Sequence, residues 1–380
     1  MSAEVDGALA GHDITTPFAI QDLVVPDALS GQDILAKAPT GSGKTLAFAL
    51  PIVERVRPAD GAPAALVLVP TRELCAQVTG DLQLVARAKG LRVAAVYGGV
   101  PLGAQAKRGR EAHVLVATPG RLQDLVDRRM ISLEHVRILV LDEADRMLDM
   151  GFKPQVERIV RRLRRDRQTM LFSATLDGEV ADLARELTRN PARFEAALAT
   201  DGSQIDVEHT FVSVTADGKL DALISALEEE RGLALVFVRT KRGADRLVHK
   251  LARRNVSAIA LHGDMSQNAR ERSLARFRAG TVTALVATDV AARGLDLAEI
   301  THVINFDPPE DDKGYVHRVG RTGRAGRGGS GITLVLPEQQ ADVSRVATRL
   351  GHRDQFEREG MRVAPARRVY TSRRGRRSRW

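Results

Sequence analysis

The chain has 380 residues and a formal net charge of +9, from 57 Lys and Arg against 48 Asp and Glu. At about 150 residues per domain this length predicts two or three domains, and 43% hydrophobic with 28% charged residues excludes global disorder. A single cysteine, Cys75, excludes an intrachain disulfide framework and a cysteine-cluster metal site. The chain starts with acidic residues rather than a basic, then apolar leader, and no run approaches the ~20 apolar residues of a membrane span. We therefore expect a cytoplasmic protein without a signal peptide.

The predicted elements alternate between buried strands and amphipathic helices. In the first half, apolar runs at 33–38, 64–69, 92–97, 113–117, 138–142 and 168–173 predict strands, followed by helical patterns such as 71–88 and 177–188. The second half repeats the rhythm, with strands at 233–238, 257–261, 283–287, 301–306 and 331–336 and helices such as 241–254 and 267–279. Near-continuous apolar strands separated by helices are typical of a parallel sheet covered on both faces. The fold class is therefore α/β.

The domain boundaries follow from where this rhythm stops. The pattern becomes small and polar around 197–206, which is typical of a linker. We expect a first domain at 1–197, a linker at 198–206, a second domain at 207–354 and a basic disordered tail at 355–380. The last 21 residues, 360–380, contain eight arginines and no acid, so they carry +8 of the net charge. Such a tail is expected to bind anionic polymers, the alternative being a merely solubilising end.

A phosphate-binding loop is predicted at residues 38–45, Ala-Pro-Thr-Gly-Ser-Gly-Lys-Thr, between a strand and a helix. Glycines allow backbone N–H groups to surround phosphate oxygens at a helix N-terminus. Lys44 would reach the terminal phosphates and the Thr45 hydroxyl would hold Mg²⁺. Ala38 replaces the first glycine of the general pattern, so the alternative is a glycine-rich turn with a surface lysine.

An acidic cluster, Asp142-Glu-Ala-Asp145, ends the apolar strand at 138–142. One carboxylate at such a strand end can hold Mg²⁺ and a second can activate the attacking water. Downstream of a phosphate loop, the cluster predicts a nucleoside triphosphatase, whereas alone it would indicate a solvated surface.

At this point the sequence resembles the DEAD-box RNA helicases of superfamily two, in particular bacterial stand-alone members with short basic tails. The resemblance rests on separated motifs that occur in order over residues 14–336. In the first half they are TPFAIQ (16–21), the phosphate loop, PTREL (70–74), GG (98–99), TPGR (118–121), DEAD (142–145) and SAT (173–175). In the second half they are VFV (236–238), HGD (262–264), QNAR (267–270), ATDVAARGLD (287–296) and HRVGRTGR (317–324). The resemblance implies two tandem RecA-like domains joined by a flexible linker.

For the nucleotide site, the resemblance implies ATP and Mg²⁺ as cofactors. Gln21 would read the adenine edge, because an amide both donates and accepts. Without the other family motifs we would favour a capping or surface role for this glutamine. The other implied ligands of the nucleotide are Thr40, Gly41, Ser42, Gly43, Lys44, Thr45 and Asp296, the last at the ribose. Asp142 would hold the metal together with Thr45, and Glu143 would activate water.

Two arginines of the last motif, Arg321 and Arg324, resemble arginine fingers for the γ-phosphate. They are three residues apart, so on a helix both could face one cleft, and such stabilisation is worth ~10³–10⁵ in rate. The neighbouring Arg318 could instead belong to a basic RNA face. The residues implied to couple the ATP site to the domain interface are Asp145, Ser173, Thr175 and His317.

For RNA, the resemblance implies contacts to the backbone of one strand. The implied residues are Arg72, Gly98, Gly99, Thr118 and Arg121 in the first domain, and Gly263, Gln267, Arg270 and Thr288 in the second. Contacts to phosphate and sugar predict weak sequence preference, and 2′-hydroxyl contacts would select RNA over DNA. We expect a monomer that closes its two domains on RNA and unwinds short duplexes or remodels RNA–protein complexes, with ribosomal or RNA-decay proteins as candidate partners of the tail.

Departures from the family and rival functions remain. Phe18-Ala19 replace the usual Thr-Pro before Ile-Gln, and Phe18 is too close to Gln21 to be the family's upstream aromatic residue. Either the chain continues before Met1 or adenine is held less tightly. The rivals are an ATP-dependent RNA clamp or tail-tethered scaffold with little unwinding, and a DNA or RNA translocase of a sister family. Only the 20 residues 297–316 separate the last two motifs, which leaves little room for the strand-splitting hairpin of some translocases.

Overall fold

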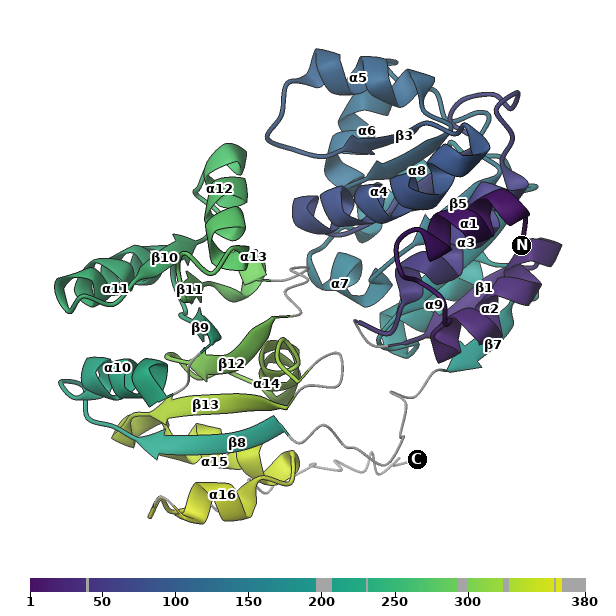
Figure 1. Ribbon diagram of the computed structural model, residues 1–380. Helices are drawn as coiled ribbons and strands as arrows, with labels where there is room; N and C mark the ends of the chain where they lie inside the picture. Colours follow the sequence, from purple (N-terminus) through teal and green to yellow (C-terminus); the bar gives the residue numbers. More distant parts are fainter. Residues whose placement is uncertain are drawn as a thin grey trace, which may run out of the picture. The chain divides into compact units, whose positions relative to one another are not determined.

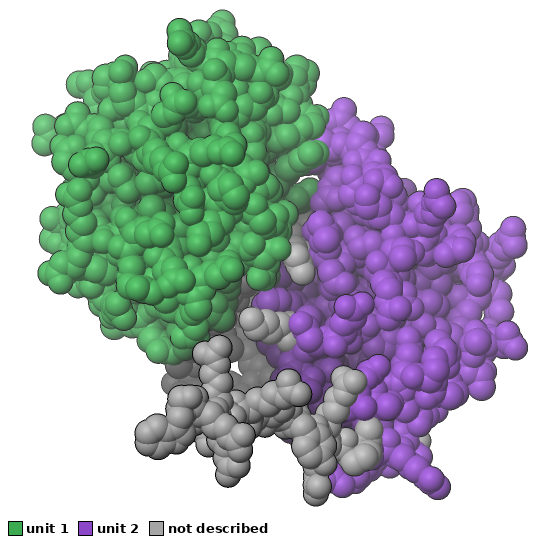
Figure 2. Space-filling view, turned by 180° about the vertical axis from the view of Figure 1, so that it is seen from behind, with its two compact units in different colours: residues 1–204, 293–296 green, residues 205–292, 297–380 purple. Residues whose placement is uncertain are grey.

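The computed structural model describes residues 1–38, 41–195, 207–229, 232–292, 299–323, 328–358 and 360–363 (Figure 1). The chain divides into two compact units: the described residues up to Glu195 form the first, and those from Val207 onward form the second (Figure 2). Each unit contains one parallel sheet between layers of helices, which confirms the predicted α/β class with two sheet domains. In the described part of the chain, no helix is both long and apolar enough to span a membrane.

The first unit contains a seven-stranded sheet in the order β3-β4-β2-β5-β6-β1-β7, with every neighbouring pair parallel. The strands are β1 (Ile34–Lys37), β2 (Ala65–Leu68), β3 (Val93–Val96), β4 (Val114–Ala117), β5 (Ile138–Leu141), β6 (Gln168–Ser173) and β7 (Ala192–Glu195). The first six were predicted within one or two residues of their ends. The edge strand β7 was not predicted, because its four residues alternate between half-buried and exposed positions and include two charges.

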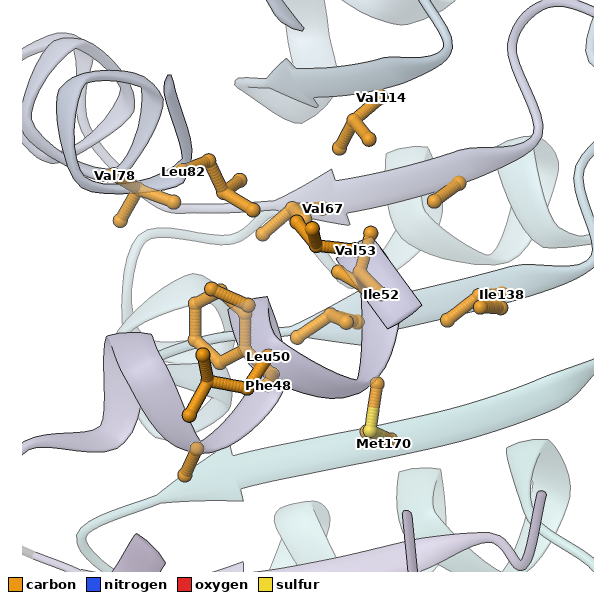
Figure 3. Close-up of a cluster of buried hydrophobic side chains, with 14 of the residues drawn as sticks. Phe48, Leu50, Ile52, Val53, Val67, Val78, Leu82, Val114, Ile138 and Met170 are labelled. Carbon is orange, nitrogen blue, oxygen red and sulfur yellow. The ribbon is translucent and has the colours of Figure 1, made fainter. Parts of the chain in front are cut away.

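Helices cover both faces of this sheet. They are α1 (Ala3–Ala10), α2 (Ala19–Ser30), α3 (Lys44–Arg55), α4 (Arg72–Ala86), α5 (Leu102–Glu111), α6 (Pro119–Asp127), α7 (Ala144–Asp149), α8 (Lys153–Val160) and α9 (Gly178–Leu187), with the 3₁₀ turn η1 (Arg87–Lys89). Side chains that alternate along each strand enter two separate cores, as β2 shows with Val67 in one and Leu66 and Leu68 in the other. Figure 3 shows the first core, where Phe48, Ile52 and Val53 of α3 lie among apolar side chains of the strands. This packing fixes α3, and with it the loop before α3.

The second unit contains a six-stranded parallel sheet in the order β10-β11-β9-β12-β13-β8. Its strands are β8 (Val207–Ser213), β9 (Leu233–Phe237), β10 (Ala258–Leu261), β11 (Ala284–Ala287), β12 (Ile300–Asn305) and β13 (Gly329–Val335). Its helices are α10 (Lys219–Glu229), α11 (Lys241–Arg253), α12 (Gln267–Arg278), α13 (Asp289–Ala292), α14 (Asp312–Val319), α15 (Gln340–Arg349) and α16 (Arg353–Arg358), with the 3₁₀ turn η2 (Pro337–Gln339). The edge strand β8 was missed in the sequence, because its residues VEHTFVS mix polar and apolar types.

The prediction of a disordered tail from residue 355 is wrong for the first residues of that segment. Helix α16 continues to Arg358, and the Phe356 ring is fully buried in an edge-to-face contact with Phe211 of β8, with centroids 5.5 Å apart. Met361 is also buried. These two apolar side chains, within an arginine-rich stretch, fix the chain to the second unit. Residues 364–380 and the predicted linker at 198–206 lie outside the described residues.

Candidate nucleotide and nucleic-acid sites

Apart from Gln21, which lies in α2, the predicted site residues of the first unit follow the carboxyl ends of six strands and form two groups. The nucleotide group follows β1, β5 and β6, which are adjacent in the sheet, and the nucleic-acid group follows β2, β3 and β4, which are adjacent as well. Strands β2 and β5 join the two groups, with Leu68 opposite Leu141 and the Asp142 N–H donating to the Leu68 carbonyl at 3.0 Å. Ligands of open α/β sheets bind at the carboxyl ends of the strands.

The phosphate loop has the backbone that its glycines predict. Gly41 and Gly43 have φ of +86° and +85°, a region that side chains rarely adopt, and Gly43 is the N-cap of α3. Lys44 is only 7% exposed, and its ammonium donates to the Ala38 carbonyl at 3.0 Å. Ser42 and Thr45 are half-buried beside it, whereas Thr40 lies outside the described residues. The loop thus combines backbone amides at a helix N-terminus with an enclosed cation, a combination suited to polyphosphate.

Gln21 connects this loop to the start of α2. Its Oε1 accepts the Phe18 N–H at 2.9 Å and its Nε2 donates to the Gly43 carbonyl at 2.9 Å. The side chain is 4% exposed. The capping role that we considered as the alternative for Gln21 is therefore real. Since an amide has two N–H donors and two acceptor lone pairs, one of each remains for a ligand.

The acidic cluster is buried at the end of β5. Asp142 and Glu143 are 3% and 4% exposed, and the Glu143 N–H donates to Asp142 Oδ1 at 3.0 Å. Glu143 has a left-handed backbone, with φ of +53°, at the sharp turn from β5 into α7. Its Oε2 accepts from Arg146 Nη1 at 2.6 Å, and both side chains of this ion pair are at most 8% exposed.

The surroundings of Asp142 fit a divalent cation. Burial, together with the charge of Glu143, raises the pKa of this carboxyl to about 6 against the opposing effect of Lys44. A carboxylate that is buried and incompletely compensated gains from a bound cation. Hard oxygen donors at Asp142 and Thr45 are the ligand type that Mg²⁺ prefers, the remaining positions being left to phosphate and water.

Three of the four residues expected to couple the ATP site to the domain interface, Asp145, Ser173 and Thr175, are joined by hydrogen bonds within the first unit. Asp145 accepts from the Ala174 N–H at 3.2 Å, and the Ser173 hydroxyl accepts from the Asp145 N–H at 3.2 Å and the Thr175 N–H at 3.4 Å. Ser173 is fully buried, and its carbonyl accepts from the Ala38 N–H at 2.9 Å. The ends of β5, β6 and β1 are thus held together under the phosphate loop.

The nucleic-acid group also forms one surface. The Arg72 guanidinium, after β2, lies against Gly98, after β3, because a Cβ at Gly98 would be 3.0 Å from Arg72 Nη2. Thr118, after β4, begins α6, and Arg121 Nη1 donates to the Val100 carbonyl at 2.8 Å and to Gln105 Oε1 at 2.9 Å. Gly99 is exposed, with φ of +86°. Accessible glycine backbone beside two guanidinium groups is suited to phosphate.

In the second unit, the corresponding residues follow the adjacent strands β10 and β11. Gly263 is exposed, whereas Gln267, Arg270 and Thr288 are 6% to 8% exposed. Arg270 donates to the His262 carbonyl at 3.2 Å, and Gln267 Nε2 donates to Glu271 at 3.1 Å. Among the residues that the structure describes, Gln267 Oε1 is buried without a hydrogen-bond partner, which marks it as an acceptor available to a ligand or water.

Two expectations about the last motif are wrong. Helix α14 ends at Val319, so Arg321 follows the helix rather than continuing it, because Gly320 caps the helix end. Arg318 is 4% exposed and is no part of an RNA face: its guanidinium donates to both carboxylate oxygens of Asp289, at 2.6 and 2.7 Å, and to Asn305 Oδ1 at 3.1 Å. It fixes α14 to the end of β11 and to β12.

The other residues of that motif are only partly described. His317 is half-buried, and its carbonyl accepts from Arg321 Nε at 3.3 Å, which keeps the largely buried Arg321 beside the last turn of α14. Asp296 and Arg324 lie outside the described residues.

Sequence reasoning missed two charged partners. Arg146 binds Glu143 from three residues further along, a spacing that the sequence shows but that usually indicates a solvated helix face. Asp289, inside the motif at 287–296, holds Arg318. In both pairs, only the burial of the arginine distinguishes the pair from surface charges.

Comparison with known proteins matches both units. The DEAD/DEAH box helicase family model matches residues 18–183, and the helicase conserved C-terminal domain matches residues 218–326. The chain is 43% identical over 322 residues to DEAD-box ATP-dependent RNA helicase CshA of Streptococcus pneumoniae, covering 84% of this chain and 61% of the relative. The same-named protein of Geobacillus kaustophilus is 42% identical over 343 residues, covering 89% and 73%. The chain thus spans less than two thirds of the length of the first of these relatives.

Solved structures agree with these matches. Dbp5 of S. cerevisiae, bound to RNA and ADP BeF3, is 29% identical with a TM-score of 0.80, covering 96% of this chain and 93% of that one. A DEAD box protein from the hyperthermophile Methanococcus jannaschii is 34% identical with a TM-score of 0.53, covering 97% of each chain.

Proposed function

Because the chain belongs to the DEAD-box helicase family, we propose that it is an ATP-dependent RNA helicase whose ATP hydrolysis is stimulated by RNA. The observation that supports this most directly is that both groups of residues follow the carboxyl ends of strands of the first sheet. A phosphate loop and a buried acidic pair follow three adjacent strands, and an arginine- and glycine-lined surface follows the other three. One rigid sheet therefore supports a nucleotide and a strand of RNA side by side.

For hydrolysis, each residue has a role that suits its chemistry. Lys44 and the loop amides bind the phosphates, Thr45 and Asp142 hold Mg²⁺, and Glu143 orients and deprotonates the attacking water. Mg²⁺, when bound, neutralises charge on the β- and γ-phosphate oxygens. Arg321 and Arg324 stabilise the charge of the transferring phosphoryl group, and Asp296 contacts the ribose.

For the work on RNA, the family supplies a local mechanism. ATP and RNA together favour closure of the two domains on one strand, a short duplex separates or a bound protein leaves the RNA, and hydrolysis reopens the helicase. Residues of both units bind the phosphate–sugar backbone, so the sequence preference is weak. Four residues couple the bound nucleotide to the RNA-binding surfaces, namely Asp145, Ser173, Thr175 and His317. We also propose that the protein acts as a cytoplasmic monomer.

The test is steady-state ATP hydrolysis with no nucleic acid, with single-stranded RNA and with DNA of the same sequence. Glu143→Gln is the control, because its amide oxygen can still accept from Arg146 and preserve the fold. We expect strong stimulation by RNA alone, lost in the variant. Equal stimulation by DNA would instead support a translocase. A hydrolysis rate that neither RNA nor DNA changes would support a clamp.

The arginine-rich end has a separate proposed role, as an electrostatic tether for RNA or for partner proteins of ribosomes or RNA decay. Residues 364–380 include seven arginines and no acid. Removing them should weaken RNA binding and flatten its salt dependence, by up to ~0.7 in the slope for each RNA phosphate that the arginines neutralise. The basal ATPase rate should not change. An unchanged salt slope would contradict the tether.

A further inference from the structure

Phe18 is an exposed aromatic ring beside the phosphate loop. Its side chain is 58% exposed, whereas every other Phe and Tyr in the described ranges is buried or half-buried. A Cβ at Gly43 would lie 2.8 Å from Phe18 Cδ2 and 2.7 Å from Gln21 Nε2. The ring and the Gln21 amide therefore lie on the same side of Gly43, at the first turn of α3.

Local folding does not favour a phenylalanine at this position. Phe18 is the N-cap of α2, where Ser, Thr, Asp and Asn are preferred because a side-chain oxygen can accept from the first free amides. A phenyl ring cannot accept, so only the reverse half of the cap forms, from the Phe18 N–H to Gln21 Oε1. Among the described residues, the ring also belongs to neither hydrophobic core of the first unit. A residue that neither caps nor packs in a core indicates a binding role.

The burial of Gln21 connects the ring to the base of a nucleotide. Gln21 is 4% exposed, and Phe18 and Gly43 are its immediate neighbours at the loop. A purine edge that reaches the remaining donor and acceptor of this amide must therefore come alongside the Phe18 ring. Stacking on an aromatic ring tolerates any base, whereas the amide can distinguish adenine from guanine.

We propose that Phe18 is a base-contacting residue of the nucleotide site, with its ring packed on the purine while Gln21 binds the purine edge. The inference rests on the proposed function in one respect, that ATP binds at the phosphate loop. It adds a contact whose partner is the base and not the phosphates.

The experiment measures binding to the full chain by displacement of a ribose-labelled fluorescent ADP, using ADP and inorganic tripolyphosphate as two competitors. The informative variant is Phe18→Thr, because threonine removes the ring and supplies a better cap for α2. Phe18→Tyr keeps the ring. Leu23→Ala, at a 44% exposed position of the same helix, is the matched control for loss of an exposed apolar side chain.

We expect Phe18→Thr to weaken ADP about tenfold, or about 1.4 kcal/mol, a typical effect of removing a base–aromatic stack. The affinity for tripolyphosphate should stay unchanged, and Phe18→Tyr and Leu23→Ala should bind ADP as the parent does. Unchanged ADP affinity in Phe18→Thr, or equal loss for both competitors, would overturn the inference. Failure of the parent chain to bind ADP at all would instead refute the proposed function.

Discussion

The buried pair Glu143–Arg146 offers a sharp test of how the acidic site is held together. Replacing Arg146 with methionine keeps an unbranched apolar stem but removes the guanidinium that Glu143 accepts from at 2.6 Å. Glu143 would then remain buried next to Asp142, with two carboxyl groups at most 4% exposed. Lys44 and Arg146 are both cations that act on Asp142, and the variant removes one of them.

The magnitude follows from that burial. Removing one partner of a buried ion pair typically costs about 3–5 kcal/mol, whereas replacing both with neutral groups costs far less. We therefore expect Arg146→Met to lower the free energy of unfolding of the first unit by about 3–5 kcal/mol. The double variant Glu143→Gln/Arg146→Met should recover about 2–3 kcal/mol of that loss. ATP hydrolysis by Arg146→Met should fall roughly 10- to 100-fold, since Glu143 is no longer positioned by the guanidinium.

The assay is urea unfolding of the full chain, fitted for two transitions because the two units can unfold separately. The four members of the cycle are the parent, each single variant and the double variant. The reasoning is refuted if Arg146→Met stays within about 1 kcal/mol of the parent. It is refuted equally if the cycle is additive to within about 0.5 kcal/mol, because contacting residues should couple more strongly.

Three further predictions concern backbone, charge and pH. Gly43→Ala should cost about 1–3 kcal/mol more stability than Gly41→Ala in urea unfolding. The two glycines have similar φ, but a new methyl group would meet side chains within 3 Å only at position 43. Equal losses in the two variants would contradict this. Asp289→Ala should destabilise the second unit by about 1–3 kcal/mol, because the largely buried Arg318 loses two charge-assisted hydrogen bonds while the Asp289 side chain itself is 38% exposed. Adding Arg318→Met should restore part of the loss rather than deepen it. His302 is fully buried, and burial lowers its pKa to about 4, whereas in the unfolded chain it takes up a proton near pH ~6.5. Stability should therefore fall by up to about 3 kcal/mol as the pH drops from about 6.5 to 4. In thermal unfolding between those pH values, His302→Leu should make stability depend less on pH. An unchanged pH dependence would exclude His302 as its cause.

The strands of both sheets could be predicted from sequence wherever both faces of the strand are buried. Such strands are continuous apolar runs, as at 138–141, and the loops after them contain the motifs. Two of the four edge strands, β7 and β8, escaped prediction, because their residues mix polar and apolar types and their pairing partners, β1 and β13, are distant in sequence. Phe356 and Met361 were overlooked because the surrounding arginines dominated the composition of that segment.

The candidate sites show a similar division. The phosphate loop and the acidic cluster could be predicted as candidate sites, because glycine spacing and acid spacing directly express the chemistry proposed for them. The roles of Arg146 and Arg318 were not, because a charged residue in a helix looks the same in sequence whether it is buried or solvated. The end of α14 was misplaced for a related reason, since the arginine spacing continued past the glycine that ends the helix.

The direct pairing of β2 with β5 has a thermodynamic consequence. The Asp142 N–H donates to the Leu68 carbonyl, four residues before Arg72, so the carboxylate that we propose for the metal and the first arginine that we propose for RNA follow neighbouring strands of one buried sheet. Binding equilibria that share such an element obey reciprocity. Whatever factor RNA contributes to the affinity for ATP, ATP must contribute to the affinity for RNA. Under the proposed function, loss of bound ATP should therefore weaken RNA binding by the same factor by which RNA strengthens ATP binding.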